Sequence, residues 1–156
     1  MWQRIQTVFL ALTALLMGVA IFMPIWVGGE PGGQTFQLYP LHFSSYRDGV
    51  IETTSYMPYA ITALLMAAAA TIAIMELRRY DDRILQIKLG TLNSLILMGV
   101  MISAVLFANQ ASSEHPAGWD YGMALYLSFG AVFFNWLAVR FIRSDEKKVR
   151  EADRMR

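Results

Sequence analysis

Residues 59–77 read YAITALLMAAAATIAIMEL, an apolar run in which Glu76 is the only charged residue. A helix of this length, at 1.5 Å per residue, nearly matches the ~30 Å hydrocarbon core of a bilayer. Three more apolar runs of at least this length occupy residues 5–27, 89–107 and 121–139. The sequence therefore predicts an all-α membrane protein, a four-transmembrane-helix bundle that forms a single membrane domain over residues 1–156.

The composition supports this prediction and excludes several kinds of chemistry. Hydrophobic residues make up 56% of the chain and charged residues 16%, and the apolar residues fall in long runs instead of alternating with polar ones. The chain has no cysteine, which excludes disulfides, thiolate metal ligands and lipid attachment through cysteine. A net charge of +1 implies no broad basic surface, so we expect no nucleic-acid partner.

The first apolar run has a competing interpretation as a cleaved signal peptide. The apolar core of a signal peptide usually spans about 7 to 15 residues and ends at a small-residue cleavage site. Residues 5–27 form a longer run, which ends in Pro24-Ile25-Trp26 and shows no Ala-x-Ala pattern. We therefore interpret the run as a retained helix.

The segments between the runs are two outer loops, residues 28–58 and 108–120, and a cytoplasmic loop, residues 78–88, followed by a cytoplasmic tail, residues 140–156. In the first outer loop, residues 34–43 and 50–56 are rich in β-branched and aromatic residues. They flank Arg47-Asp48-Gly49, a turn sequence. This pattern predicts a small β-hairpin, although Pro40 interrupts its first strand. The tail is expected to extend the fourth helix.

The orientation follows from the positive residues, which are retained on the cytoplasmic side of bacterial membranes. Arg47 is the only lysine or arginine in the expected outer loops. The other twelve lie before the first run, between the second and third, and after the fourth. The pattern predicts a multi-pass protein of the bacterial inner membrane with both termini in the cytoplasm.

Two asparagines lie inside predicted spans at matching depths. Asn93 is five residues after Lys88, and Asn135 is five residues before Arg140. Because a side-chain amide in hydrocarbon is costly without a partner, we expect both to face the interior. We predict an interhelical polar contact between them, either direct or through water. A polar step in a transport path is the alternative interpretation.

Glu76 is the only carboxylate within a predicted span, and it lies near the cytoplasmic end of that span. Arg79 follows three residues later, which places the two side chains within reach on one face of a helix. Carboxylates of proton relays usually lie deeper in the membrane. We therefore predict an interfacial salt bridge between Glu76 and Arg79.

No catalytic, cofactor-binding or metal-binding residues are predicted. Haem bundles need histidines on membrane helices, but both histidines of this chain, His42 and His115, lie in the outer loops. No phosphate loop, nucleophile elbow or dinucleotide fingerprint is present. A metal or acid–base site assembled from outer-loop residues is a minor alternative, and its candidates are His42, His115, Glu30, Asp48, Glu52, Glu114 and Asp120. We expect no cofactor, and any tightly bound molecules of the bundle itself are expected to be structural lipids.

Both ends of the chain carry recognisable motifs. The opening Met1-Trp-Gln-Arg-Ile-Gln-Thr7, the segment at residues 83–93 and the closing stretch at residues 145–156 resemble a known family. It is a family of small four-helix inner-membrane proteins of unknown function, found mainly in the Bacteroidetes group of bacteria. The resemblance implies no activity, but it marks cytoplasmic docking candidates: Arg4, Arg83, Lys88, Asp145, Glu146, Arg150 and Arg154.

These observations favour a non-enzymatic accessory or structural subunit of a larger inner-membrane complex. Its expected partners are membrane lipids and other proteins of that complex. A small oligomeric transporter or channel is one alternative, although few polar residues lie within the predicted spans. A lipid-binding or quinone-binding protein is another, because such a site needs only an apolar cleft and one or two polar groups.

Overall fold

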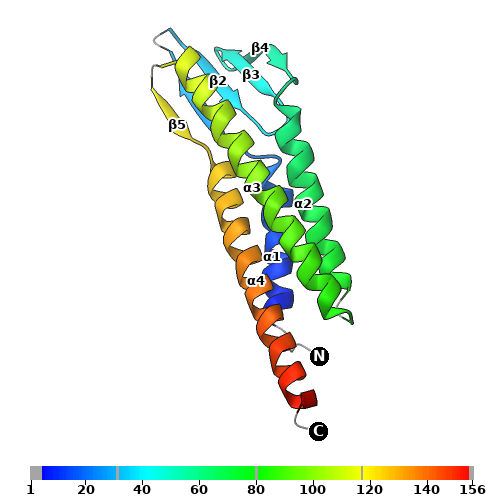
Figure 1. Cartoon of the computed structure of the whole chain (residues 1–156). Helices are drawn as coiled ribbons and strands as arrows, with labels where there is room; N and C mark the ends of the chain where they lie inside the picture. Colours follow the sequence, from blue (N-terminus) through cyan, green and yellow to red (C-terminus); the bar gives the residue numbers. More distant parts are fainter. Residues whose placement is uncertain (1–4, 31, 80, 117, 155–156) are drawn as a thin grey trace.

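The computed structural model describes residues 5–30, 32–79, 81–116 and 118–154. These residues form four helices and five strands (Figure 1). The helices are α1 (Ile5–Ala20), α2 (Ala60–Arg78), α3 (Arg83–Glu114) and α4 (Met123–Arg154). The strands are β1 (Trp26–Gly29), β2 (Gln34–Leu38), β3 (Phe43–Arg47), β4 (Val50–Ser55) and β5 (Trp119–Tyr121).

The helices pack in a ring in which α1 contacts α2 and α4, while α3 contacts the same two helices. The strands gather at one end of the bundle, and α4 projects beyond the other helices at the opposite end (Figure 1). We call these the sheet end and the tail end. Small residues line the helix contacts, as expected where close packing is the main source of helix association in lipid. They include the fully buried Ala69, Ala104, Ala131 and Ala138.

Helices α2, α3 and α4 are long and apolar enough to cross a membrane, and α1 is a shorter apolar helix of 16 residues. The chain is therefore a multi-pass membrane protein. The tail at residues 140–154 continues α4, which confirms the expected helical extension of the fourth span.

The first helix was predicted to extend to residue 27, and this prediction is wrong. Helix α1 ends at Ala20. Pro24 disfavours helical geometry at the residue before it, and the chain turns into β1. The backbone groups of Ile25, which follows the helix, are hydrogen-bonded within the protein. Ile25 N–H donates to Leu38 O at 2.7 Å, and Gly122 N–H donates to Ile25 O at 2.7 Å.

The strands form one antiparallel sheet in the order β4-β3-β2-β1-β5. The predicted turn is present at Asp48 and Gly49, whose φ values of 52° and 80° suit a tight hairpin turn between β3 and β4. The predicted pairing of residues 34–43 with 50–56 is wrong, because the chain turns back after β2 at Pro40 and places β3 between β2 and β4. Strands β1 and β5 extend the sheet on the other side of β2.

Candidate functional site

The buried polar groups of the tail half centre on the two asparagines. Asn93 Nδ2 donates to Asn135 Oδ1 at 3.1 Å, so the predicted interhelical contact is present as a direct hydrogen bond. Asn135 Nδ2 donates in turn to Ser94 Oγ at 2.8 Å and to the Gly90 carbonyl at 3.2 Å. Both asparagine side chains are buried. This network ties α3 to α4.

Glu76 lies beside this network, and its predicted salt bridge with Arg79 is absent. Helix α2 ends at Arg78, and Arg79 has left helical geometry with φ −94° and ψ 42°. The three-residue spacing therefore no longer places the two side chains on one face. Arg79 is exposed, whereas Glu76 is fully buried and points into the bundle. Neither carboxyl oxygen of Glu76 has a hydrogen-bond partner among the described residues.

The space for the Glu76 carboxyl group is provided by a glycine on α3. A Cβ added at Gly90 would lie 2.8 Å from Glu76 Oε1 and 2.5 Å from Val139 Cγ2 of α4. Any side chain at this position would collide with both groups. At Gly90, side chains of α2 and α4 thus lie against the backbone of α3.

Gln86 fixes the connection between α2 and α3. Its Nε2 donates to the Glu76 carbonyl at 3.0 Å, which satisfies one of the acceptors that a helix leaves open at its C-terminus. Asp82 begins α3 by accepting a hydrogen bond from Leu85 N–H at 2.9 Å. The side-chain oxygen of Gln86 is buried and has no partner among the described residues, and the same holds for Asn93 Oδ1.

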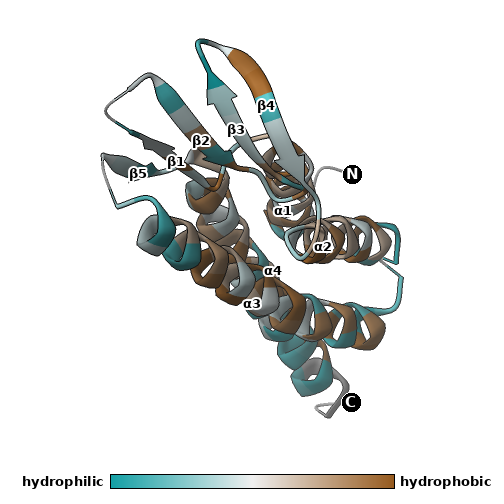
Figure 2. Cartoon of the chain, turned by 90° about the horizontal axis from the view of Figure 1, so that it is seen from above, coloured by the Kyte–Doolittle hydropathy of each residue, from teal (hydrophilic) through white to brown (hydrophobic). Residues whose placement is uncertain are grey.

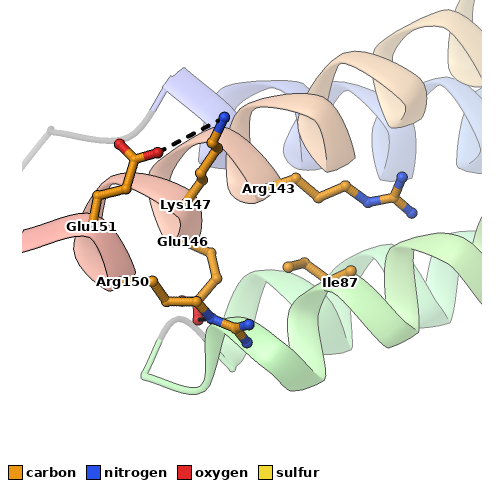
Figure 3. Close-up of a pocket in the computed structure, with 6 residues that line it drawn as sticks. All are labelled: Ile87, Arg143, Glu146, Lys147, Arg150 and Glu151. Atoms are coloured by element: carbon orange, nitrogen blue, oxygen red, sulfur yellow. Dashed lines mark hydrogen bonds and ion pairs between the residues drawn. The ribbon is translucent and has the colours of Figure 1, made fainter. Parts of the chain in front are cut away.

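A second feature of the tail end is an open groove of about 430 Å³ between the start of α3 and the projecting part of α4 (Figure 3). Its charged residues largely satisfy one another, since Glu146 pairs with Arg150 at 2.9 Å and Lys147 with Glu151 at 3.8 Å. Arg143 Nη2 donates to Thr91 Oγ1 at 3.1 Å. Ile87 lines the groove from α3.

The docking candidates are placed as follows. Glu146 and Arg150 pair within α4, and Asp145 is half-buried beside them. Arg83 is half-buried and Lys88 exposed, both near the start of α3. Arg4 lies outside the described residues, and so does the side chain of Arg154.

At the sheet end, His115 Nδ1 lies 3.0 Å from Glu30 Oε1, and its ring stacks on Phe36 at 3.7 Å between centroids. His42 packs elsewhere, against Tyr39 and Tyr56. Within the described ranges, no group of three metal-ligating side chains is assembled. Burial, followed by the neighbouring Tyr46, raises the pKa of Tyr39 above its ordinary value.

The sequence prediction missed Gln86 and Gly90. Gln86, Gly90 and Asn93 recur at helical spacings of four and three residues, which places them on one face of α3. This spacing was the available signal. The asparagines were found because their depth could be counted from the nearest charges, whereas the importance of Gly90 depends on which helices meet there.

The fold and its buried polar groups define a small multi-pass membrane protein with a sheet at one end of a helix bundle. Residues 2–155 match the family described as a domain of unknown function, DUF4293. The chain therefore belongs to this family, which covers nearly its whole length. A search of the curated proteins found no match.

Proposed function

We propose that the protein is a non-enzymatic accessory subunit of a larger bacterial inner-membrane complex and that a partner subunit adds a strand to β4. The observation that carries this proposal is the free edge of the sheet. All six residues of β4 are exposed, and β4 has a hydrogen-bonded neighbour, β3, on one side only. The edge therefore presents unpaired backbone groups to a partner chain.

The edge carries few of the devices that usually prevent strand addition. Soluble sheets protect their edges with prolines, unpaired charges or bulged geometry. Strand β4 contains no proline, and its one charged residue, Glu52, already pairs with Arg47 at 3.2 Å. The register with β3 shifts at Glu52, so the edge has one bulge. Val50 and Ile51 are 69% and 59% exposed and form an apolar segment on β4 (Figure 2). An apolar edge with a single bulge fits a permanent partner.

The proposed orientation places the tail end in the cytoplasm and the sheet outside. Lysine and arginine concentrate at the tail end, and Arg47 on β3 is the exception. In this orientation, α1 together with residues 21–27 crosses the membrane as the first of four spans. Phe22 and Met23 of this segment are exposed and apolar, as suits a lipid-facing surface, whereas Ile25 and Trp26 are 1% and 0% exposed. Non-helical backbone is tolerated at membrane depth where protein covers it, as it does at Ile25 and Trp26.

The transporter alternative receives less support from the sheet half of the bundle. Thr62 there donates to Ser103 Oγ at 3.1 Å, and Ser128 donates to the Ala124 carbonyl at 2.8 Å. These hydroxyls satisfy one another or their own helices, so among the described residues they form no chain of open polar groups toward the sheet. The buried polar groups are better explained as structural contacts together with a local site at the tail end.

The experiment is native mass measurement after purification of the tagged full chain in mild detergent. We expect a complex that contains a different polypeptide at fixed stoichiometry. An Ile51→Lys variant places a charge on the β4 edge and is expected to lose that polypeptide. Thr35→Lys is the matched control, because Thr35 is also exposed but lies on the inner strand β2.

Three results would contradict the proposal. The first is a lone monomer of the wild-type chain, and the second is a complex that contains only copies of this chain. The third is a partner that is retained equally by both lysine variants, which would show that the β4 edge is not the contact.

A further inference from the structure

The tail end of the bundle holds a surplus of buried hydrogen-bond acceptors. Five buried oxygens there have no partner among the described residues: both carboxyl oxygens of Glu76 and the side-chain oxygens of Gln6, Gln86 and Asn93. Gln6 lies in the first turn of α1, which begins at this end. Buried polar groups are almost always paired, so these acceptors call for a donor or a cation that the described residues do not supply.

The surplus is not removed by turning the amides. Gln86 Nε2 already donates to the Glu76 carbonyl, and Asn93 Nδ2 already donates to Asn135 Oδ1. Exchanging oxygen and nitrogen in either side chain would break these bonds. In this arrangement the oxygens of Gln86 and Asn93 have no donor among the described residues.

Among the described residues, the cluster carries one formal negative charge and no buried positive charge. Glu76 is the only charged residue of these ranges with a buried side chain. The described arginines and lysines of this end on α2, on α3 and in the adjoining part of α4 are exposed or half-buried: Arg78, Arg79, Arg83, Lys88, Arg140 and Arg143. The other buried residues that the structure describes at this end of the bundle include no titratable group: α1 offers Gln6, α3 offers Gln86, Gly90 and Asn93, and α4 offers Asn135 and Val139.

We propose that Glu76, with the side-chain oxygens of Gln86 and Asn93, forms a binding site for one monovalent cation, either a proton or a Na⁺-sized ion. An unpaired carboxylate in an apolar interior is very costly, and one positive charge neutralises it. Carboxylate and amide oxygens are hard ligands that suit such an ion. Gly90 lies between Gln86 and Asn93 on α3 and keeps the space in front of the carboxyl group open.

The site does not depend on the proposed partner at β4, because it lies at the opposite end of the bundle. Its occupant changes the stability of the fold. If the occupant is a proton, the folded protein keeps a proton that the unfolded chain releases above about pH 4.3, so stability falls as pH rises. If Na⁺ replaces the proton, added Na⁺ restores stability at high pH by mass action.

The test is thermal unfolding of the full chain in detergent micelles between about pH 5 and 9, with NaCl compared with choline chloride at equal ionic strength. We expect the wild-type Tm to fall as pH rises in choline chloride. Glu76→Gln should have a flat profile, because the amide needs no counter-charge. Glu114→Gln is the control: Glu114 is exposed on α3, and its removal should leave the wild-type profile unchanged.

The Na⁺ comparison distinguishes the two occupants. A rise of about 5 °C in NaCl at high pH, absent in Glu76→Gln, would identify a Na⁺ site. Equal Tm values in NaCl and choline chloride, with the pH dependence intact, would identify a proton site. Identical pH and salt responses of the wild type and Glu76→Gln would overturn the proposal.

A second measurement covers the case in which Glu76→Gln does not fold. Hydrophobic carbodiimides modify protonated carboxyl groups in apolar sites, and the adduct is located by mass spectrometry of the wild-type protein. We expect modification at Glu76 that is faster at low pH and, for a Na⁺ site, slower in NaCl. Failure to modify Glu76 at any pH, while exposed carboxyl groups react, would also overturn the proposal.

Discussion

Replacing Gly90 by alanine tests whether three helices meet as closely as the structure shows. The added Cβ would lie 2.5 Å from Val139 Cγ2 and 2.8 Å from Glu76 Oε1, both well inside van der Waals contact. Val139 is β-branched and restricted in its rotamers on a helix, so it has little freedom to move away. Overpacking a core costs about 1–3 kcal/mol.

Alanine also has a higher helix propensity than glycine, by about 1 kcal/mol, and this gain opposes the clash. With two clashing neighbours, we expect a net loss of about 1–2 kcal/mol in the free energy of unfolding. Gly99→Ala is the matched control on the same helix. Its Cβ would meet only Leu65 Cδ1, at an ordinary 3.6 Å, so the variant should be unchanged or stabilised by up to about 1 kcal/mol.

The assay is reversible unfolding in mixed micelles of mild detergent and dodecyl sulfate, followed by tryptophan fluorescence. The clash with Val139 is isolated by a double-mutant cycle, because Val139→Ala removes the methyl group that the new Cβ would strike. Gly90→Ala should cost less in the Val139→Ala background than in the wild type. If Gly90→Ala proves at least as stable as Gly99→Ala, the close approach of α2, α3 and α4 is refuted.

Three further outcomes are expected in the same unfolding assay. Asn135→Leu removes the donors to Ser94 and Gly90 and the acceptor of Asn93, and should lower the free energy of unfolding by about 1–2 kcal/mol. An unchanged free energy of unfolding would show that the network is energetically neutral. Trp26→Ala empties a fully buried position and should cost about 3–5 kcal/mol; a loss below that of Asn135→Leu would contradict its place in the core. Gly49→Ala forces a side chain into a φ of +80° and should cost about 1 kcal/mol, and a gain in stability would argue against this turn.

The helix bundle could be predicted because hydrocarbon imposes a minimum length on every span. Residues 59–77 and the other long runs have no other physical explanation in a chain of this size. The contact between Asn93 and Asn135 could also be predicted, since the charges at Lys88 and Arg140 mark the depth of both residues.

The sheet was harder to predict because its strands are short or resemble a helix. Trp26 and Val27 continue an apolar run, and the change to a strand is marked only by Pro24 before them and the glycines after them. Strand β5 has three residues, fewer than any pattern of alternation needs. Its existence depends on β1, which lies about 90 residues earlier in the chain.

The environment of Glu76 could not be predicted from its neighbours in sequence. Its position near the end of a span suggested the membrane surface, where a carboxylate pairs with an arginine. The direction of a side chain at a helix end depends on where the helix stops and on what packs beside it. Here α2 stops before Arg79, and Gly90 of another helix opens the space that receives Glu76.

The pairing of β1 with β5 imposes an order on biosynthesis. Strand β1 is made directly after the first helix, whereas β5 is made only after the third, so the β1 edge stays open while most of the chain is synthesised. Because β1 follows α1 and β5 precedes α4, the two strands can pair only when the first and fourth helices lie side by side. A chain terminated after Glu114 would lack β5 and leave the β1 edge unpaired. Such an exposed strand edge is a site of aggregation and of recognition by the cell's quality-control proteins.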